Sequence, residues 1–331
     1  MYIMSEKMNR RSFVKKSALA SAATIVGLSF RQRALLAKTS SSEAAPAARP
    51  SDAGLPMGRI GQVKISKLIV GSNLFGGGAH SRDLRYVGAL MKHYFTHEKI
   101  MDTLQLCEEN GINTSVGGGG VKKYNKERGG KLQVIGQLGP SVDDPTSQAQ
   151  KAIDGGAVGA FIWGKRAEDL VQANRLDVIE KFVSILKTNG AIAGVGAHDW
   201  RVVAACEKAK IDVDFYFKTI HPDNYWSAYP EEERRPFLVD SFGPDDHDCM
   251  WEQYHEETIE LMKKVKKPWI GYKVLAAGAV HPREGFKYAF ANGADFVCAG
   301  MIDFQIAEDV DITKDILAKL NKTGRERPWR G

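Results

Sequence analysis

Patterns that mark metal sites or disulfide frameworks are missing from this sequence. Its four cysteines, Cys107, Cys206, Cys249 and Cys298, show neither CxxC pairs nor regular spacing, and there is no HExxH motif. The first, second and fourth lie in apolar segments and are expected to be small core residues, whereas Cys249 lies in a polar loop. A disulfide scaffold is therefore not expected, and a zinc site would have no motif to support it.

A long apolar run is also missing. Residues 17–30 are mildly apolar and span about 14 positions, short of the roughly 20 that a membrane-spanning helix needs. The segment before them, Asn9-Arg-Arg-Ser-Phe-Val-Lys15, resembles the twin-arginine translocation motif. We expect residues 1–37 to be a twin-arginine signal peptide and residues 38–56 a disordered linker. The twin-arginine translocase would then export the protein to the periplasm, where an uncleaved signal is the alternative to cleavage after Ala37.

The chain has no patch of positive charge that would imply nucleic acid as a partner. Its formal charge of +6 is concentrated at the two ends of the sequence, in residues 1–37 and 319–330. The remaining residues, 57–331, suit one domain, because α/β barrels routinely run to about 250 residues.

Apolar, β-branched segments alternate with amphipathic ones from residue 67 onward, which is the pattern of βα units. Eight strands are predicted, at residues 68–71, 113–116, 132–137, 157–163, 191–197, 215–219, 269–275 and 296–300. A helix is predicted over 170–187, ending at Asn189-Gly190. A doubly wound sheet would usually carry a GxGxxG turn after its first strand, and none is present. The sequence thus predicts an α/β protein of the (β/α)8 TIM-barrel class, with its chemistry at the carboxyl ends of the strands.

Several segments resemble the aldo/keto reductases. Residues 57–71 resemble the first hairpin and strand of that family, residues 109–113 its second strand, residues 179–198 its fifth strand and the preceding helix, and residues 267–278 its seventh strand. The resemblance implies an aldo/keto-reductase-like barrel that reduces carbonyls with NADPH, using an Asp, a Tyr, a Lys and a His. The matching positions here hold Val116, residues 117–121, Gln137 and Trp163 or Gly164, so direct matching fills none of the four roles.

Titratable residues at other strand ends offer an alternative machinery. His198 follows the fifth strand, His221 the sixth, and Lys273 lies at the seventh, so these three are predicted to act as acid/base groups. Tyr124 is the candidate for a relocated proton donor. His198, His221 and Asp223 could also hold a divalent metal, since imidazole and carboxylate suit zinc, manganese or iron. The structural alternative is that His221-Pro222 only turns the chain and that His198 only hydrogen-bonds a neighbouring loop.

Substrate-binding residues are predicted around the same barrel mouth. The candidates are His80, Arg82, Trp163, Gln137, Tyr225 and Trp226. The last two lie in a long insertion, residues 222–257, which exceeds ordinary loop lengths and is predicted to be lid-like. Its aromatic and acidic residues suit a sugar ring, or a loop that packs on its own aromatics.

Three functions stay open at this point. The first is an exported enzyme of the aldo/keto-reductase type that acts on a carbonyl-bearing or sugar-like small molecule by a non-standard mechanism. The second is an NADPH-dependent oxidoreductase with a relocated proton donor. The third is a non-catalytic barrel that binds a ligand. A small molecule is the expected partner in each, and the cofactor, whether NADPH or a divalent metal, is undetermined.

Overall fold

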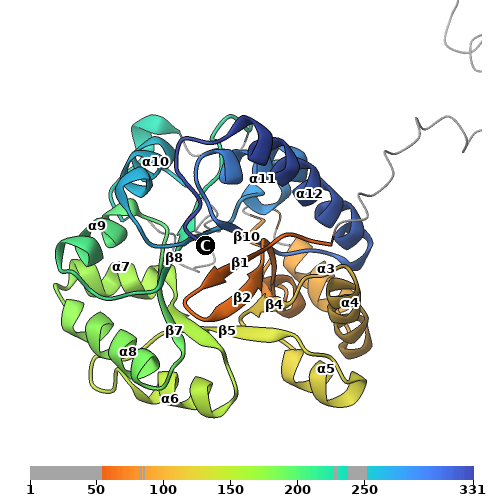
Figure 1. Ribbon diagram of the computed structural model, residues 1–331, viewed down its shortest axis with the longest axis horizontal. Coiled ribbons are helices and arrows are strands. Elements are labelled where there is room, and N and C mark those ends of the chain that lie inside the picture. The colour runs from red at the N-terminus through yellow and green to blue at the C-terminus, as the bar shows by residue number, and fades with distance from the viewer. Residues whose placement is uncertain (1–53, 82–83, 85, 227, 229, 238–251) are drawn as a thin grey trace, which may run out of the picture. The chain divides into compact units, whose positions relative to one another are not determined.

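The structure, a computed structural model, describes residues 54–81, 84, 86–226, 228, 230–237 and 252–331. The predicted signal peptide, most of the predicted linker and Arg82 lie outside the described residues. From residue 54 onward the chain folds into a ring of helices around a closed barrel of eight parallel strands (Figure 1).

Barrel strands follow one another in sequence order around the ring, and the last pairs with the first. They are β3 (Leu68–Gly71), β4 (Thr114–Val116), β5 (Gln133–Leu138), β6 (Gly159–Ile162), β7 (Ile192–Ala197), β8 (Phe215–Thr219), β9 (Trp269–Tyr272) and β10 (Phe296–Ala299). All eight predicted strands are therefore confirmed, and so is the TIM-barrel class.

Alternation along each strand explains why both faces of the barrel are packed. In β8, Phe215 and Phe217 point into the barrel, whereas Tyr216 belongs to the core between strands and helices. The interior core also holds Phe161 and Ile270 from other strands. A barrel strand buried on both faces needs this nearly continuous apolar sequence.

The helices lie outside the barrel and connect successive strands (Figure 1). They are α3 (Tyr86–Tyr94), α4 (His97–Glu109), α5 (Val121–Arg128), α6 (Ser147–Asp154), α7 (Gly164–Gln172), α8 (Leu176–Thr188), α9 (Trp200–Lys208), α10 (His255–Lys264), α11 (Pro282–Ala291) and α12 (Ile306–Thr323). Short 3-10 turns follow the first, sixth, seventh and eighth barrel strands: η1 (Asn73–Gly76), η2 (Glu231–Glu233), η3 (Ala276–Gly278) and η4 (Asp303–Gln305). Among the described residues, no helix is long and apolar enough to cross a membrane.

One predicted helix is wrong in extent. Residues 170–187 fall into two helices, α7 and α8, which are separated by Ala173, Asn174 and Arg175. Asn174 has a φ of 54°, a left-handed conformation that ends α7. The predicted end at Asn189-Gly190 is confirmed, since Asn189 caps α8 and Gly190 has a φ of 74°.

A two-stranded hairpin covers the amino-terminal end of the barrel. Its strands, β1 (Met57–Ile60) and β2 (Val63–Ser66), lie across the centre of the ring in Figure 1. Ile60 and Ile65 are completely buried and join the interior core. Because this end is plugged, the opposite end is where the barrel opens to ligands.

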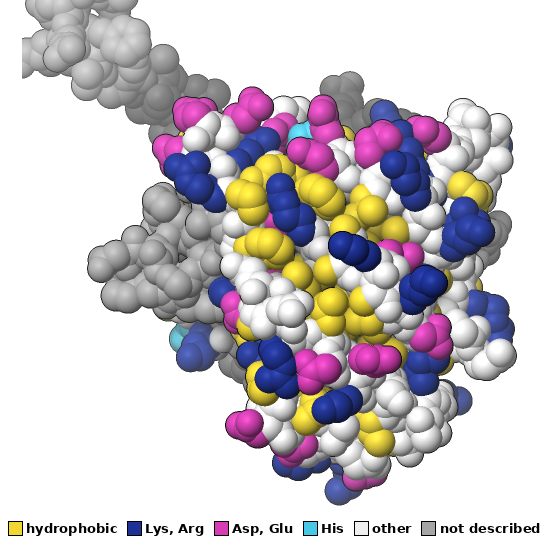
Figure 2. Space-filling model, turned by 90° about the vertical axis from the view of Figure 1, so that its left-hand side faces the viewer, with side chains coloured by type: hydrophobic (Ala, Val, Ile, Leu, Met, Phe, Trp, Pro, Cys, Tyr) yellow, Lys and Arg dark blue, Asp and Glu magenta, His cyan; other side chains and the backbone are white. Residues whose placement is uncertain are grey.

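The outer face that carries α7, α8 and α9 is not uniformly polar. Figure 2 shows hydrophobic side chains gathered near its centre, with lysines, arginines and carboxylates across and around them.

Cys107, Cys206 and Cys298 are buried free thiols, as predicted, whereas Cys249 lies outside the described residues.

Candidate functional site

A cavity of about 750 Å³ opens at the carboxyl ends of the barrel strands. Its walls come from every part of the barrel: Ser72 follows β3, Gln137 lies on β5, Trp163 follows β6, His198 follows β7 and Tyr272 ends β9. This is the end at which TIM barrels carry out chemistry. The volume suits a small-molecule ligand.

His198 is paired with a buried carboxylate at the wall of this cavity. Its Nδ1 lies 3.2 Å from Oε1 of Glu168, a residue of α7 that is completely shielded from solvent. The same Oε1 accepts the backbone N–H groups of His198 at 2.6 Å and Asp199 at 3.0 Å. These contacts fix the orientation of the imidazole and direct its Nδ1–H toward Glu168. Nε2 is then the ring nitrogen left for a ligand.

Burial and the charge of the partner shift the pKa values of His198 and Glu168 in opposite directions. Burial lowers the pKa of His198 below its ordinary value, the Glu168 carboxylate opposes that change, and the nearby charge of Lys273 adds to it. For Glu168, burial acts to raise the pKa, but His198 and the two backbone N–H groups outweigh it, so the pKa is lowered. The result is a neutral imidazole beside a carboxylate near pH 7, which suits a proton acceptor.

Tyr272 lies beside His198, with ring centroids 5.7 Å apart, and stacks on Phe217 at 4.3 Å. Close packing from α7 holds both rings, because a Cβ on Gly164 would come within 2.6 Å of Nδ1 of His198 and 3.0 Å of the Tyr272 hydroxyl. Only a glycine fits at the start of this helix. The Tyr272 hydroxyl and the imidazole thus share one corner of the cavity.

Lys273 follows directly and also lines the cavity. It has a φ of 56°, and Ala276 and Ala277 in the same turn have φ values of 44° and 55°. Left-handed conformations are unfavourable for non-glycine residues and persist where surrounding structure enforces them, often at functional sites. Gly285 of α11 supplies that support, since any Cβ there would come within 2.3 Å of the Val274 carbonyl oxygen.

No family profile matches this sequence, and no curated protein matches it. Among solved structures, two proposed aldo-keto reductases from Pseudomonas aeruginosa match at TM-score 0.50, with 16% and 15% identity. They cover 81% and 80% of this chain and 96% and 98% of their own. The chain has the barrel fold of these proteins. An N-acetylmannosamine-6-phosphate 2-epimerase from Clostridium perfringens also matches, at TM-score 0.41 and 14% identity over 77% of this chain and 92% of its own.

The cavity wall holds a tyrosine, a lysine and a histidine, but on other strands than those that the resemblance implies. Tyr272 and Lys273 come from β9 and the turn after it, and His198 follows β7. Tyr124, the predicted relocated donor, is wrong in position: it is buried on α5, outside the cavity lining, and donates to Glu108 at 2.7 Å. Burial and then Glu108 raise the pKa of Tyr124, so it holds its proton firmly.

The predicted metal ligands do not converge. His221 is buried, and its Nε2 accepts the backbone N–H of Glu252 at 2.7 Å while Nδ1 lies 2.8 Å from the Pro222 carbonyl oxygen. Asp223 is paired instead with Arg234 at 2.7 Å and His255 at 3.3 Å. Within the described part of the chain, no three His, Cys, Asp or Glu side chains are grouped to hold a metal ion. The prediction of a site at His198, His221 and Asp223 is therefore corrected.

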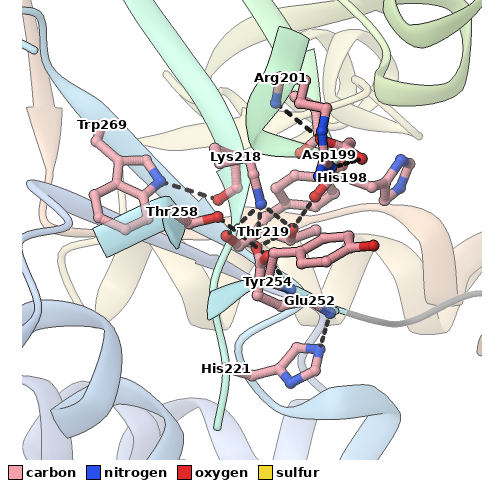
Figure 3. A network of polar contacts seen from close by, with 12 residues as sticks. His198, Asp199, Arg201, Lys218, Thr219, His221, Glu252, Tyr254, Thr258 and Trp269 are labelled. Atoms are coloured by element: carbon pink, nitrogen blue, oxygen red, sulfur yellow. Dashed lines mark hydrogen bonds and ion pairs between the residues drawn. The ribbon is translucent and has the colours of Figure 1, made fainter. Parts of the chain in front are cut away.

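Behind His198 lies the buried network of Figure 3. The Lys218 ammonium forms an ion pair with Glu252, and the Thr219 hydroxyl lies 2.6 Å from the same carboxylate and 3.2 Å from the His198 carbonyl oxygen. Lys218, Glu252 and Thr219 are almost fully buried. This network joins His198, directly after β7, to Glu252 in the last part of the predicted insertion.

The predicted substrate-binding residues are divided between the cavity and the surface. His80, Gln137 and Trp163 line the cavity, and His80 Nε2 lies 3.3 Å from Asn73 Nδ2. Tyr225 and Trp226 do not line it, and Trp226 is 90% exposed. Of the predicted lid-like insertion, residues 238–251, which include Trp251 and its acidic neighbours, lie outside the described residues, as does Tyr229.

Glu168 and Tyr272 were missed at the sequence level. Glu168 falls on the buried face of α7, together with Gly164 and Ala167 at helical spacing. A carboxylate on an apolar helix face is rarely buried without a partner, so the position of Glu168 in the sequence indicates that its carboxylate binds another polar group. Tyr272 shares the inward phase of Ile270 in β9, which alternation along a strand would have revealed.

Proposed function

We propose that the protein is an enzyme that transfers a proton at a carbon next to a carbonyl group of a small molecule. The observation that carries this proposal is the pairing of buried Glu168 with His198 at the cavity wall, where Nδ1 and Oε1 lie 3.2 Å apart. Such a pair fixes the tautomer of the imidazole and presents Nε2 as a base.

In this mechanism Nε2 of His198 accepts the proton as the C–H bond breaks. The electron pair of that bond moves toward the carbonyl carbon, and the carbonyl π electrons move onto oxygen, giving an enolate. The Lys273 ammonium and the Tyr272 hydroxyl stabilise the negative oxygen. Protonated Nε2 then returns the proton to the same carbon as the carbonyl re-forms, so atoms and electrons balance within the substrate and the side chains.

Proton exchange measured in D2O tests this proposal. Small ketones, 2-oxo acids and sugar phosphates are incubated with the protein, and exchange of their C–H groups is followed by ¹H NMR. His198→Asn keeps an N–H group facing Glu168 and removes Nε2, so it should slow exchange by about 100-fold or more, in the range typical of a lost general base. His97→Asn, on exposed α4, is the matched control.

If His198→Asn exchanged protons as fast as the native protein, the proposed base would be wrong. If ligands bound but no exchange occurred with any carbonyl compound, the non-catalytic binding function would be favoured instead.

The alternative of an NADPH-dependent reductase is favoured by one observation, the gathering of Tyr272, Lys273 and His198. The residues present do not fit the cofactor, however. After β9 and β10 the described lining consists of Val274, Leu275, Ala277, Gly278, Gly300, Ile302 and Gln305, with no arginine or lysine after Lys273 to hold its phosphates. We therefore derive no hydride-transfer step. Titration with NADPH, followed by tryptophan fluorescence, tests this alternative directly.

We also propose that the twin-arginine motif at Arg10 and Arg11 exports the folded protein to the periplasm. The support is the sequence of the motif and the short apolar run behind it. In cell fractionation, Arg10→Lys with Arg11→Lys should retain the protein in the cytoplasm. Export of this double variant at the native level would argue against the twin-arginine route.

A further inference from the structure

The wall of the cavity opposite His198 is apolar. In the closed ring of eight strands, β3 lies four places from β7, so the connection after β3 faces the one that carries His198. From the connection after β3 come Leu74, Val87 and Met91, which line the cavity. Ile302, which follows the neighbouring strand β10, lines it too. A ligand whose polar end lies at His198 therefore meets hydrocarbon side chains across the barrel.

Helix α3, which carries part of this wall, lies directly against the mouth of the barrel. A Cβ on Gly77, the residue that caps η1, would come within 2.7 Å of the Gly88 carbonyl oxygen, and a Cβ on Gly88 within 2.9 Å of the Gly77 carbonyl oxygen. The two glycines thus let the backbones of α3 and η1 touch. At the other end of α3, the Tyr94 hydroxyl donates to Asp303 of η4 at 2.5 Å. Both turns therefore hold this helix beside the cavity.

The apolar surface continues from the cavity to the exterior. Tyr86 and Leu90 of α3 are chain neighbours of cavity-lining residues, and they are 68% and 51% exposed. Phe304 of η4 lies between the lining residues Ile302 and Gln305 and is 72% exposed. We call Tyr86, Leu90 and Phe304 the apolar rim. Single exposed apolar residues are ordinary, whereas several on adjoining elements at the edge of a cavity indicate a surface that a ligand covers.

Polar side chains of the same connection are held by one another. Asn73 Nδ2 lies 3.3 Å from Nε2 of His80, and the Ser81 hydroxyl donates to the Leu84 carbonyl oxygen at 2.9 Å. These groups stay paired when an apolar ligand covers the wall, so covering them costs less than burying unpaired polar groups would.

We propose that the substrate carries a hydrocarbon chain, which lies along Leu74, Val87 and Met91 and extends over the apolar rim. This inference rests on the proposed function for the carbonyl group at His198, whereas the chain follows from the opposite wall and the rim. Each methylene that enters this surface is removed from water and stabilises the complex in proportion to its area. Because the rim continues the wall outward, the surface accepts chains longer than the cavity itself.

A homologous series of methyl ketones, from 2-butanone to 2-decanone, tests the inference. Binding is measured by calorimetry and by tryptophan fluorescence, to which Trp163 at the cavity wall contributes. We expect affinity to rise about three-fold for each added methylene, as complete burial of a methylene typically gives. As a matched pair, 2-octanone should bind about ten-fold more tightly than 8-hydroxy-2-octanone, whose terminal hydroxyl would have to leave water.

Variants separate the wall from the rim. Val87→Thr replaces one methyl group by a hydroxyl of similar size and should weaken binding of 2-hexanone and every longer ketone several-fold. Leu90→Ser and Phe304→Ser should weaken 2-octanone and 2-decanone and leave 2-butanone unchanged. Val142→Ser is the matched control, because Val142 is exposed and lies outside the described cavity lining. It should change no member of the series.

Affinity that does not depend on chain length, or no detectable binding of any ketone, would overturn the inference. The rim variants distinguish another occupant. If Leu90→Ser and Phe304→Ser left the series unchanged but shifted the oligomeric state in sedimentation, the rim would be an interface between copies of the chain. If they instead abolished association with phospholipid vesicles, it would be a membrane contact. Either result would overturn the assignment of the rim to the substrate.

Failure of this inference differs from failure of the proposed function. Binding that depends on chain length without exchange in D2O would leave the inference standing and remove the catalytic base. Exchange that needs His198 but has the same rate and affinity for 2-butanone and 2-decanone would do the opposite.

Discussion

At the residue scale, the site is organised by contacts that leave little freedom to two rings. His198 is fixed by Glu168 on one side and by the backbone of Gly164 on another. Tyr272 stacks on Phe217 and approaches the same glycine. Each contact can be altered by a single substitution that leaves the barrel strands intact.

Activity should depend on pH through His198. The imidazole must be neutral to accept a proton, and burial, despite Glu168, keeps its pKa below the ordinary value of 6.5. Activity should therefore be full at pH 7 and fall at lower pH, where the imidazole of His198 becomes protonated. Glu168→Gln removes the charge that raises this pKa, so the acid limb of the rate profile should move to lower pH. The plateau rate should fall about 10- to 100-fold, as when the partner of a functional histidine is lost.

A rate loss in Glu168→Gln without movement of the acid limb would indicate that Glu168 only supports the fold. Thermal unfolding of the variant separates that case from the electrostatic one.

Gly164→Ala should displace both rings. The new Cβ would lie 2.6 Å from Nδ1 of His198 and 3.0 Å from the Tyr272 hydroxyl, closer than carbon contacts allow. We expect kcat to fall at least ten-fold, while the free energy of unfolding changes by only about 1–3 kcal/mol, as overpacking typically costs. Gly76→Ala is the control, because a Cβ there has no neighbour within 4 Å. Equal kinetics in both variants would show that ring placement is not critical.

Sequence reasoning identified the mouth of the barrel better than the partnerships within it. His80, Gln137, Trp163, His198 and Lys273 were named from strand ends, and all five line the cavity. The pairing of His198 with Glu168 joins residues 30 positions apart on different elements, so no spacing rule reports it. Long-range partners of this kind depend on how α7 packs against β7, which local patterns do not specify.

At the scale of elements, the loop after β8 is joined to the barrel by buried charges. Lys218→Met would leave the Glu252 carboxylate buried without its cation, which typically costs about 3–5 kcal/mol of stability. Replacing both residues, as in Lys218→Met with Glu252→Met, should recover part of this loss, because no lone charge remains. Denaturant unfolding of the native protein and these two variants measures the effect. A double variant less stable than Lys218→Met would contradict this account.

Helix α12 carries a carboxylate that opposes folding at high pH. Burial, and to a lesser extent Glu308, raises the pKa of Asp309 to about 7 from 3.8. Between pH 4 and 7 the folded protein keeps a proton that the unfolded chain releases, so stability should fall as the pH rises through this window. Asp309→Asn should remove the fall and stabilise the protein by about 2 kcal/mol at pH 8, estimated from roughly 1.4 kcal/mol per pKa unit with an allowance for relaxation.

Asp315→Asn, on the exposed side of the same helix, is the matched control for this measurement. A pH-independent gain in Asp309→Asn would mean that the carboxylate is already neutral or paired throughout.

At the scale of the whole molecule, residues 325–331 bind the chain to the closed end of the barrel. Arg327 is buried, lies 2.7 Å from Asp295, and donates to the backbone carbonyls of Met262, Gly293, Val265 and Lys267. Arg325 pairs with the same Asp295 at 2.9 Å. Several connections between strands and helices therefore meet at one guanidinium group.

Arg327→Met should lower the free energy of unfolding by about 3–5 kcal/mol, since it leaves several buried carbonyls and part of a carboxylate without a donor. Ligand binding at the opposite end should be preserved in the variant below its melting temperature. Thermal unfolding and the same fluorescence titration measure the two effects. Loss of binding with unchanged stability would contradict the view that the closed end of the barrel stabilises the fold while the opposite end binds the ligand.

The barrel was predictable as a whole because each of its units repeats the same signal. All eight strands were located within a few residues, because the apolar run of a buried strand can be recognised without knowing which strands lie beside it. The predicted helix over 170–187 failed because the left-handed turn at Asn174 has no marker stronger than a single asparagine. The predicted metal group failed because His221 and Asp223 turn away from His198 to partners in the loop after β8.

The insertion after β8 leaves the barrel and returns to it at almost the same point. The backbone N–H of Phe237 donates to Asp199 at 2.7 Å, and Glu252 meets Thr219, whose hydroxyl lies 3.2 Å from the carbonyl oxygen of His198, the residue before Asp199. The length of chain between two such fixed points can change at little entropic cost, since doubling a loop costs only about 0.6 kcal/mol. Related proteins could therefore differ in the length and sequence of the segment between Phe237 and Glu252, and so in specificity, while the barrel strands keep their positions.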